Sequence, residues 1–484
     1  MFFRQIIDPL LSQHAYLIGC ETVKEAVLFE PERDIDRYLK LAQKNGYKIV
    51  AAAETHIHAD YLSGLRQFAE AGFKVYASDE GDDDWKYDWL QGSKYNYQLL
   101  KNNDTFSVGK ITFKVIHTPG HTPDHICFEI SEKQNGNSKV HGILTGDFVF
   151  VGDVGRPDLL ESAAGIVGFA ETAAVQLFDS IQKFKNFAAE LMVWPSHGAG
   201  SACGKSLGVS PMSTVGQELQ YNPSIQAAQD RKKFTDFILS GQPEPPYYFA
   251  RMKVENKKGP AVIKALPIPK KLSFEDVNNL AGQKNKIVLD GRDWEDFRRG
   301  HIKGTLFAPL DKYFLMVTGS YIEPEIEIAL VCEEDTIGQT SAALSRVGHD
   351  RITGYITPEE FERGRENSRS IETIDEISVG QLREIQMRGE GHILDVRNAQ
   401  ELDETGQIEG ALQIAYTRLL LQHNELPQEG RIHVYCRSGN RSEYACSFLK
   451  NAGYKVSHVA GGIVAWQRLG LAVVPCRAGL GDKV

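Results

Sequence analysis

The chain has 484 residues, of which 42% are hydrophobic and 24% are charged, and these values exclude a disordered protein. At about 150 residues per domain, this length predicts roughly three domains. The formal net charge of −10 argues against a general nucleic-acid or anionic-membrane binder, because such a protein needs a basic surface.

Localisation and thiol chemistry are constrained by what the sequence lacks. It has no run of about 18 apolar residues that could span a membrane, and residues 1–19 are too polar for a signal peptide. Its seven cysteines are odd in number and include no C-x-x-C pair, which argues against a disulfide framework. We therefore expect a cytoplasmic protein with reduced thiols and with no membrane or nucleic-acid partner.

The first 250 residues alternate short apolar runs with polar loops and helical patterns, which predicts an α/β domain. Four of the apolar runs are followed within a few residues by histidine or aspartate. These are His56, His58 and Asp60 after 49–53, His121 after 111–116, Asp147 after 142–144, and His197 after 191–194. Because the strands of a sheet deliver such loops to one edge, we expect these side chains to converge there as a metal site.

At these residues the chain resembles the metallo-β-lactamase superfamily, whose metal ligands lie on loops in this order. The resemblance covers about residues 1–245 and implies an αββα sandwich with a metal at one edge. Hydrolases of the superfamily read H-x-H-x-D-H and hold two metals, whereas Tyr61 replaces the last histidine here. A phenol with a pKa of about 10 is a poor ligand at neutral pH, so a dinuclear hydrolase is disfavoured.

The ligand set that remains is His56, His121 and Asp147, two imidazoles and one carboxylate, which suits non-haem Fe(II). The same set is typical of the persulfide dioxygenases, the iron-dependent branch of the superfamily. The stretch 145–159 is also similar to the T-G-D…G-R-x-D sequence of that branch. The resemblance implies one Fe(II) per chain, and oxidation of a small thiol persulfide by O₂ to sulfite and the free thiol.

Further residues are expected around this centre. His58 and Asp60 are expected to orient the ligands, and His197 is expected near the metal with its role open. Arg156 either orients the anionic part of the substrate or forms a structural salt bridge. Cys203 lies in a glycine-rich loop, which is expected to expose its side chains, so this thiol could reach the substrate.

A proline-rich stretch at 242–246 marks the end of this domain. Beyond it the sequence repeats at an offset of 105 to 106 residues, so that D-G-R at 290–292 returns as D-V-R at 395–397. Copies this far apart indicate duplicated domains, and their strand–loop–helix order predicts parallel α/β sheets. The predicted segments are a metallo-β-lactamase-type domain at 1–250, a linker at 251–271, and α/β domains at 272–367 and 372–478.

The second copy carries a cysteine between a strand and a helix. Cys436 follows the predicted strand 431–435 and precedes a helical stretch at 443–451. Backbone N–H groups and the helix N-terminus favour a thiolate at such a junction, and Arg437 and Arg441 add positive charge. A buried structural thiol fits poorly beside two arginines.

Together with D-V-R at 395–397 and A-G-G-I-V-A-W at 460–466, this loop resembles the rhodanese sulfurtransferases over about residues 373–478. A related phosphatase loop has five residues between its cysteine and arginine. Here only four separate Cys436 from Arg441, a tighter ring that suits a sulfane sulfur. The resemblance implies that Cys436 is the nucleophile and that the rest of the loop binds substrate, namely Arg437, Ser438, Gly439, Asn440 and Arg441.

The first copy lacks this machinery. It reads V-C-E-E-D at 331–335, and at the offset of 105 Cys436 aligns with Val331, which leaves Cys332 one position out of register. Three carboxylates replace the arginine-bearing loop, and they raise the pKa of a thiol and repel anions. We therefore predict a degenerate, inactive rhodanese-like domain at 272–367 that serves as a spacer or an interface.

The order of domains resembles the fused bacterial persulfide dioxygenase–sulfurtransferases of sulfide detoxification. In this hypothesis sulfite takes sulfane sulfur from a Cys436 persulfide and leaves as thiosulfate, and the chain forms a homo-oligomer, either a dimer or a tetramer. One alternative is a glyoxalase II-type zinc thioester hydrolase joined to a sulfur carrier. Another is that both C-terminal copies are regulatory sulfide-sensing modules without enzymatic activity.

Overall fold

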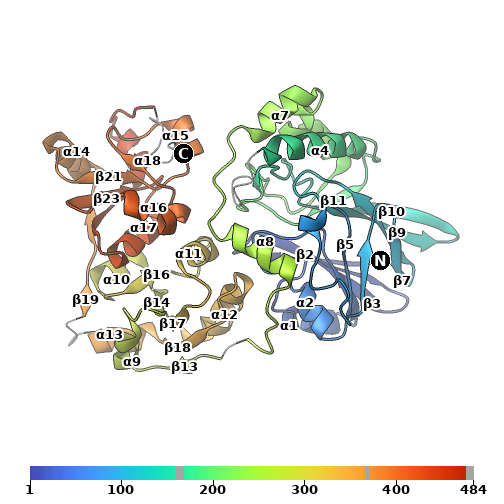
Figure 1. Ribbon diagram of the computed structural model, residues 1–484, viewed down its shortest axis with the longest axis horizontal. Helices are drawn as coiled ribbons and strands as arrows, with labels where there is room; N and C mark the ends of the chain where they lie inside the picture. Colours follow the sequence, from blue (N-terminus) through green and yellow to red (C-terminus); the bar gives the residue numbers. More distant parts are fainter. Residues whose placement is uncertain (160–167, 267, 366–369, 476–484) are drawn as a thin grey trace. The chain divides into compact units, whose positions relative to one another are not determined.

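The computed structural model describes residues 1–159, 168–266, 268–365 and 370–475. Residues 476–478, at the end of the predicted second α/β domain, lie outside the described part. The chain divides into two compact units, Met1–Lys264 and Ala265–Val484, which are described separately (Figure 1).

The N-terminal unit is built on two six-stranded sheets whose strands follow the chain order. The first sheet consists of β1 (Phe2–Asp8), β2 (Gln13–Cys20), β3 (Glu25–Phe29), β4 (Lys48–Ala53), β5 (Lys74–Ser78) and β6 (Tyr97–Leu100). The second consists of β7 (Thr105–Val108), β8 (Ile111–His117), β9 (Ile126–Gln134), β10 (Asn137–Gly146), β11 (Met192–Pro195) and β12 (Ser213–Thr214). The predicted strands in this half are therefore confirmed.

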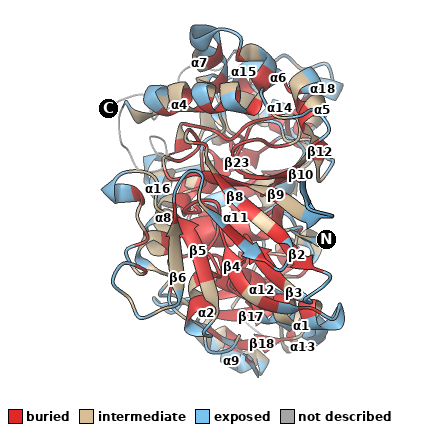
Figure 2. Ribbon diagram, turned by 90° about the vertical axis from the view of Figure 1, so that its right-hand side faces the viewer, coloured by how far each residue is buried: buried red, intermediate tan, exposed pale blue. Residues whose placement is uncertain are grey.

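Apolar side chains hold these sheets in a four-layer sandwich. Phe29, Phe113 and Phe128 lie between the two sheets, with ring centroids 5.1 Å from Phe29 to each of the others. Figure 2 shows β4 and β5 largely buried. The outer faces are covered by α1 (Asp36–Lys44) and α2 (Leu65–Glu70) on one side and by α4 (Phe169–Phe184) and α7 (Arg231–Leu239) on the other. This arrangement confirms the predicted αββα sandwich.

The helix α8 (Phe249–Lys258) belongs to the N-terminal unit, which differs from the linker predicted at 251–271. Its Asn256 is buried and donates from Nδ2 to the carbonyl oxygens of His58 and Tyr61, both at 2.8 Å. These bonds satisfy backbone groups of the loop that carries the predicted metal ligands. The lysine-rich composition of this segment indicates a linker, and the buried amide of Asn256, which helps to anchor the segment, has no sequence signal.

The C-terminal unit contains two five-stranded parallel sheets with the same topology. The first has the order β13 (Lys270–Lys271), β18 (Ile352–Ile356), β17 (Glu327–Val331), β14 (Lys286–Asp290) and β16 (Thr305–Phe307). The second has the order β20 (Asp375–Ile377), β24 (Lys455–Val459), β23 (Arg431–Tyr435), β21 (His392–Asp395) and β22 (Leu412–Gln413). All neighbouring strands in both sheets are parallel, as predicted.

The two copies in this unit pack directly against each other. The backbone N–H of Phe307 donates to Ser447 Oγ at 2.7 Å, and Tyr444 Oη donates to Asp311 at 2.7 Å. Ser447 and Tyr444 both lie on α17 (Asn440–Asn451), the helix that follows Cys436. The first copy therefore contacts the helix that carries the thiol loop. Among the described helices of either unit, none has the length and apolarity needed to cross a membrane.

Candidate metal centre and thiol site

Three loops bring a metal-binding set together at one edge of the N-terminal sandwich. His56 follows β4, His121 follows β8 and Asp147 follows β10. One ligand atom from each lies within 4.8 Å of the others, and each residue is at most 2% exposed. The three side chains therefore lie close together beyond the ends of their strands, as the sequence predicts.

The two imidazoles are oriented by the chain around them. Nδ1 of His56 lies 2.8 Å from Thr55 Oγ1, and Nδ1 of His121 lies 3.0 Å from the carbonyl oxygen of Arg156. These contacts leave the Nε2 atoms to face Asp147 Oδ2, at 4.0 Å from His56 and 3.5 Å from His121. Ligating histidines characteristically use their other ring nitrogen in this way.

The protonation states also suit a metal. Burial lowers the pKa of His56 and of His121, so both rings are neutral near pH 7. Burial opposes ionisation of Asp147, but His197 and the neighbouring imidazoles hold the pKa of this carboxyl well below its usual range. Its Oδ2 is buried without a hydrogen-bond partner. Because an isolated buried carboxylate oxygen is costly, a cation held by the two Nε2 atoms and Oδ2 is the group that fits.

His197 lies between two carboxylates. Its Nδ1 is 2.7 Å from Asp147 Oδ1, and its Nε2 is 2.7 Å from Asp60 Oδ2. Burial disfavours the imidazolium, but Asp147 and Asp60 raise the pKa of His197 well above its usual value. The ring thus holds Asp147 through Oδ1 and leaves Oδ2 facing His56 and His121. Asp60, His197 and Cys203 form a second close group of potential ligands.

His58 lies beside the centre but outside the close three-ligand group. Its Nε2 is 2.6 Å from Glu30 Oε2, and the phenol of Tyr61 is 3.1 Å from the same nitrogen. Burial lowers the pKa of His58, but Glu30 raises it to about 9. Burial and Glu30 raise the pKa of Tyr61 well above its usual value, so the phenol stays protonated and is no anionic ligand.

Arg156 is buried and bound by the chain itself. Its Nε and Nη2 donate to the two carboxylate oxygens of Asp158 at 2.9 and 2.6 Å, and Nη1 donates to the carbonyl oxygen of Ala202 at 3.4 Å. Its backbone N–H donates to the carbonyl oxygen of Cys203 at 3.2 Å. Arg156 therefore forms a salt bridge with Asp158, which is one of the two roles expected for it.

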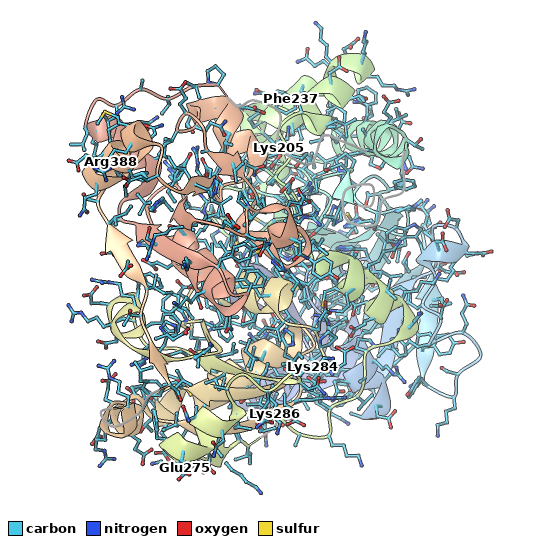
Figure 3. The ribbon with its side chains drawn as sticks, turned by 60° about the vertical axis from the view of Figure 1, so that its left-hand side comes forward. Lys205, Phe237, Glu275, Lys284, Lys286 and Arg388 are labelled. Atoms are coloured by element: carbon cyan, nitrogen blue, oxygen red, sulfur yellow. The ribbon has the colours of Figure 1, made fainter. Side chains whose placement is uncertain are left out.

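Cys203 is buried, at 2% exposure, which differs from the exposed side chain expected of a glycine-rich loop. The loop folds inward because Asp153 Oδ2 accepts from the backbone of Lys205 at 2.8 Å. Lys205 Nζ in turn donates to the carbonyl oxygen of Phe237 at 2.7 Å, and Figure 3 labels both residues. Burial and the carboxylate of Asp60 raise the pKa of Cys203 well above its usual value, so its thiol is protonated at neutral pH.

Sequence reasoning missed several residues that support the centre. Glu30 accepts from the N–H of Thr55 at 2.8 Å as well as pairing with His58. His125 accepts through Nε2 from the N–H of Asp147 at 3.0 Å. Glu30 directly follows β3, so the strand-end pattern that revealed the other residues could have found it. His125 and Asn256 carry no such signal.

The thiol site of the C-terminal unit lies where the sequence predicts it. Cys436 follows β23 and precedes α17, and it is 1% exposed. The N–H of Gly439 donates to its Sγ at 3.2 Å, and Ser442 Oγ lies 3.6 Å from the same atom. The sulfur thus lies beside two hydrogen-bond donors, directly before the N-terminus of α17.

The rest of the thiol loop divides into exposed and paired side chains. Arg437, Ser438 and Asn440 are exposed. Arg441 donates from Nη1 and Nη2 to the two carboxylate oxygens of Glu401 at 2.5 and 2.7 Å. Burial opposes the charge of Arg441, but Glu401 raises the pKa of this guanidinium. The carboxylate of Glu401, which the sequence analysis did not identify, therefore offsets the positive charge expected from Arg441.

The prediction that Cys332 is out of register is wrong. The parallel pairing places Val331 opposite Asp290 in the first copy and Tyr435 opposite Asp395 in the second. The next residue in each case is the cysteine, so Cys332 occupies the position equivalent to Cys436. The offset falls from 105 at the aspartates to 104 at the cysteines because one residue is lost between them.

The local environment still distinguishes the two cysteines. Burial and the carboxylate of Glu333 raise the pKa of Cys332 to about 11, so the thiol is protonated at neutral pH. The D-x-R motif is common to both copies, since Arg292 pairs with Asp290 at 2.7 Å and Arg397 with Asp395 at 2.6 Å. Both pairs are buried, so the motif that revealed the repeat supports the fold of each copy.

Two protein-family models match separate parts of the chain. The Metallo-beta-lactamase superfamily model matches residues 8–197, and the Rhodanese-like domain model matches residues 378–469. The chain is 38% identical to a metallo-beta-lactamase of Staphylococcus aureus subsp. aureus COL of known crystal structure, with a TM-score of 0.65. The match covers 74% of this chain and 99% of that one. The chain belongs to the metallo-beta-lactamase superfamily. Its C-terminal region contains a rhodanese domain.

Curated relatives within the superfamily include an oxygenase and a hydrolase. The chain is 24% identical over 230 residues to the mitochondrial persulfide dioxygenase ETHE1 of Homo sapiens, covering 46% of this chain and 76% of that protein. It is 26% identical over 197 residues to a probable polyketide biosynthesis zinc-dependent hydrolase, BaeB, of Bacillus velezensis, covering 40% and 77%. A superfamily domain with a persulfide dioxygenase relative, joined to a rhodanese domain, indicates an enzyme of sulfur metabolism.

Substitution of Gly155 tests how tightly the metal centre is packed. A Cβ at this residue would lie 1.8 Å from the carbonyl oxygen of Asp147 and 3.0 Å from His121 Cβ. Gly155→Ala should therefore displace a ligand and weaken metal binding at least about tenfold, measured by metal content after dialysis against a chelator. Gly338→Ala, where a Cβ meets nothing within 4 Å, is the matched control. Equal metal retention in both variants would contradict this packing.

Proposed function

We propose that the chain is a bifunctional sulfur-oxidising enzyme. The N-terminal unit uses one Fe(II) and O₂ to oxidise a small thiol persulfide to sulfite and the free thiol. The rhodanese domain forms a persulfide on Cys436 and transfers its sulfane sulfur to sulfite, which gives thiosulfate. The proposal includes a cytoplasmic location, a role in sulfide detoxification, a homo-oligomeric state (dimer or tetramer), and a degenerate rhodanese-like first copy at 272–367.

The observation that carries the first activity is the three-residue set of His56, His121 and Asp147. Two neutral imidazoles and one carboxylate with a free oxygen are the ligand set of non-haem Fe(II) sites that react with O₂. A structural zinc site would be closed by four ligands. When bound, Fe(II) would supply the O₂ chemistry of the reaction. The balance is RSSH + O₂ + H₂O giving RSH, SO₃²⁻ and two protons.

The residues around the centre perform the remaining tasks. His197 holds a proton between Asp60 and Asp147, and its Nδ1–H fixes Asp147 Oδ1 so that Oδ2 is left for the metal. The neutral thiol of Cys203 is close to both Asp60 and His197 and would contact the substrate beside the centre. Arg156 would support this wall of the site through Asp158 and the loop that contains Cys203.

The second activity follows from the donors around Cys436. The thiolate attacks the outer sulfur of a donor persulfide RSS⁻, which forms Cys436–S–S⁻ and releases RS⁻. Sulfite then takes the outer sulfur and leaves as thiosulfate, which restores the thiolate. The N–H of Gly439 and the N-terminus of α17 stabilise the anionic sulfur in both steps. The exposed Arg437 would attract the anionic acceptor.

The alternative function is zinc-dependent thioester hydrolysis, with the rhodanese domain as a sulfur carrier. The similarity to BaeB and the group Asp60, His197 and Cys203 favour it. Against it, a second metal would have to break the two ion pairs of His197. Anaerobic reconstitution with iron, followed by O₂ uptake with a panel of thiol persulfides, tests the proposal. One iron per chain and persulfide-dependent uptake support the oxygenase, and two zincs with thioesterase activity support the alternative.

The metal ligands can be tested one at a time. His56→Ala, His121→Ala and Asp147→Ala should each abolish iron binding and O₂ consumption, because even groups that only support a ligand cost about 10- to 100-fold when removed. His141→Ala removes an imidazole that pairs with Glu132 outside the centre, and it should keep both properties. Tyr61→Phe should also keep its iron. Loss of iron from Tyr61→Phe alone would contradict the assignment of the ligands.

The two cysteines at equivalent strand ends provide a matched pair. Cys436→Ser should leave O₂ consumption intact and change the product from thiosulfate to sulfite, because a serine hydroxyl cannot carry the persulfide. Cys332→Ser should change neither product, since its thiol is protonated and faces carboxylates. Anion chromatography at equal O₂ uptake, corrected for the uncatalysed reaction of sulfite with persulfide, measures both. Thiosulfate formation at the original rate in Cys436→Ser would refute the sulfurtransferase assignment.

A further inference from the structure

Three side chains connect the first copy of the C-terminal unit to the thiol loop of the second. Glu376 on β20 and His458 on β24 are partners in the parallel pairing of these strands. Glu376 Oε2 accepts from the indole N–H of Trp294 at 3.1 Å and lies 2.9 Å from His458 Nδ1. Trp294 begins α10 (Trp294–Arg299) of the first copy, and its ring contacts the ring of His458 with centroids 5.2 Å apart.

The other nitrogen of His458 reaches the backbone that holds the catalytic thiol. His458 Nε2 lies 3.2 Å from the carbonyl oxygen of Gly439, whose N–H donates to Cys436 Sγ at 3.2 Å. His458 is 2% exposed, so water does not compete for this contact. Gly439 has φ of 119°, a conformation that favours glycine, and its orientation needs support from its neighbours.

The Gly439 carbonyl also competes with Cys436 for one proton. Ser442 Oγ lies 2.6 Å from this carbonyl oxygen and 3.6 Å from Cys436 Sγ, and a hydroxyl donates only one hydrogen bond at a time. When His458 Nε2–H donates to the carbonyl, the hydroxyl of Ser442 becomes available to the sulfur. A thiolate with two donors is more stable than a thiolate with one.

We propose that Glu376 and His458 are positioning residues for the Cys436 thiolate, and that the first copy supplies Trp294 to hold them. The inference rests on the proposed sulfurtransfer at Cys436. It assigns a task to a copy whose own cysteine is protonated. His458 satisfies the Gly439 carbonyl, Glu376 orients the ring of His458, and Trp294 fixes the carboxylate of Glu376.

Charged groups from two neighbouring helices act on Glu376 and on the start of α17. Arg298 Nη2 of α10 lies 3.8 Å from Glu376 Oε1 and favours its ionised form. Glu443, in the first turn of α17, has a pKa raised to about 7 by burial and by the carboxylates of Glu376 and Asp311. Both neighbours of His458 are acceptors, so only a doubly protonated ring donates to both of them at once. Burial lowers the pKa of His458, so near neutral pH the ring carries one N–H, and the tautomer with this N–H on Nε2 is the one that donates to the Gly439 carbonyl.

The test measures thiolate formation at Cys436 in the full-length protein. The rate of alkylation by iodoacetamide is followed against pH, with the Cys436 peptide quantified by mass spectrometry. His458→Leu should move the midpoint upward by about one pH unit, an approximately tenfold change in the ratio of thiolate to thiol. His458→Gln, which keeps a donor near the position of Nε2, should restore most of the shift. Trp294→Phe keeps an aromatic ring without the N–H and should produce a smaller shift in the same direction.

His392→Leu is the matched control, because this histidine lies in the same domain and contacts the carbonyl oxygen of Glu429 at the surface. Its midpoint should be unchanged. The inference is overturned if His458→Leu and Trp294→Phe both keep the original midpoint, if His458→Gln behaves as His458→Leu, or if the control shifts equally. Alkylation needs no sulfur substrate, so loss of the proposed function and loss of this inference are distinguishable. Thiosulfate formation by the same variants, with kcat reduced about tenfold and KM retained, gives the second readout.

Discussion

The carboxylate of Asp147 is the group on which the N-terminal unit depends. Oδ1 is held by His197, the backbone N–H donates to His125, and Oδ2 is left facing His56 and His121. A buried carboxylate oxygen without a partner is unfavourable unless a cation completes it. The surrounding loops therefore hold two neutral imidazoles and one anionic oxygen close enough together that they would bind one metal ion.

The charges beside Asp147 also bear on whether the centre holds one metal ion or two. In this chain the positive charge beside Asp147 is an imidazolium, since His197 lies between two carboxylates at 2.7 Å. Tyr61 reinforces this arrangement because its protonated phenol contacts His58. His58 is itself paired with Glu30. These paired charges of the protein lie beside Asp147, which supports the proposal of one metal ion.

The two copies in the C-terminal unit share a sheet topology and differ in the surroundings of their cysteines. Both copies keep the buried D-x-R ion pair and place a cysteine directly after the equivalent strand. The sulfur of Cys436 accepts from the backbone N–H of Gly439, and the helix α17 begins at Asn440. Burial and the carboxylate of Glu333 favour the neutral thiol of Cys332. The first copy instead packs against α17, through Phe307 and Asp311. In the proposed reaction, sulfite made in one unit is the acceptor for the other.

The sequence by itself determined the elements and the chemistry of the sites. Short apolar runs followed by histidine or aspartate predict strand ends. β8 and β10 both pair antiparallel with β9, so they run in the same direction and deliver His121 and Asp147 to one edge of the sheet. The strand–cysteine–helix order predicts the site of Cys436 in the same way. Only the tertiary structure decided the partners of these groups. His125, Glu401 and Asn256 act through contacts between residues far apart in the chain, for which local sequence carries no pattern, whereas Glu30 directly follows β3 and fits the strand-end pattern. The register of Cys332 was decided by strand pairing, because hydrogen bonding across a sheet tolerates a one-residue change in the connecting loops that a fixed sequence offset does not.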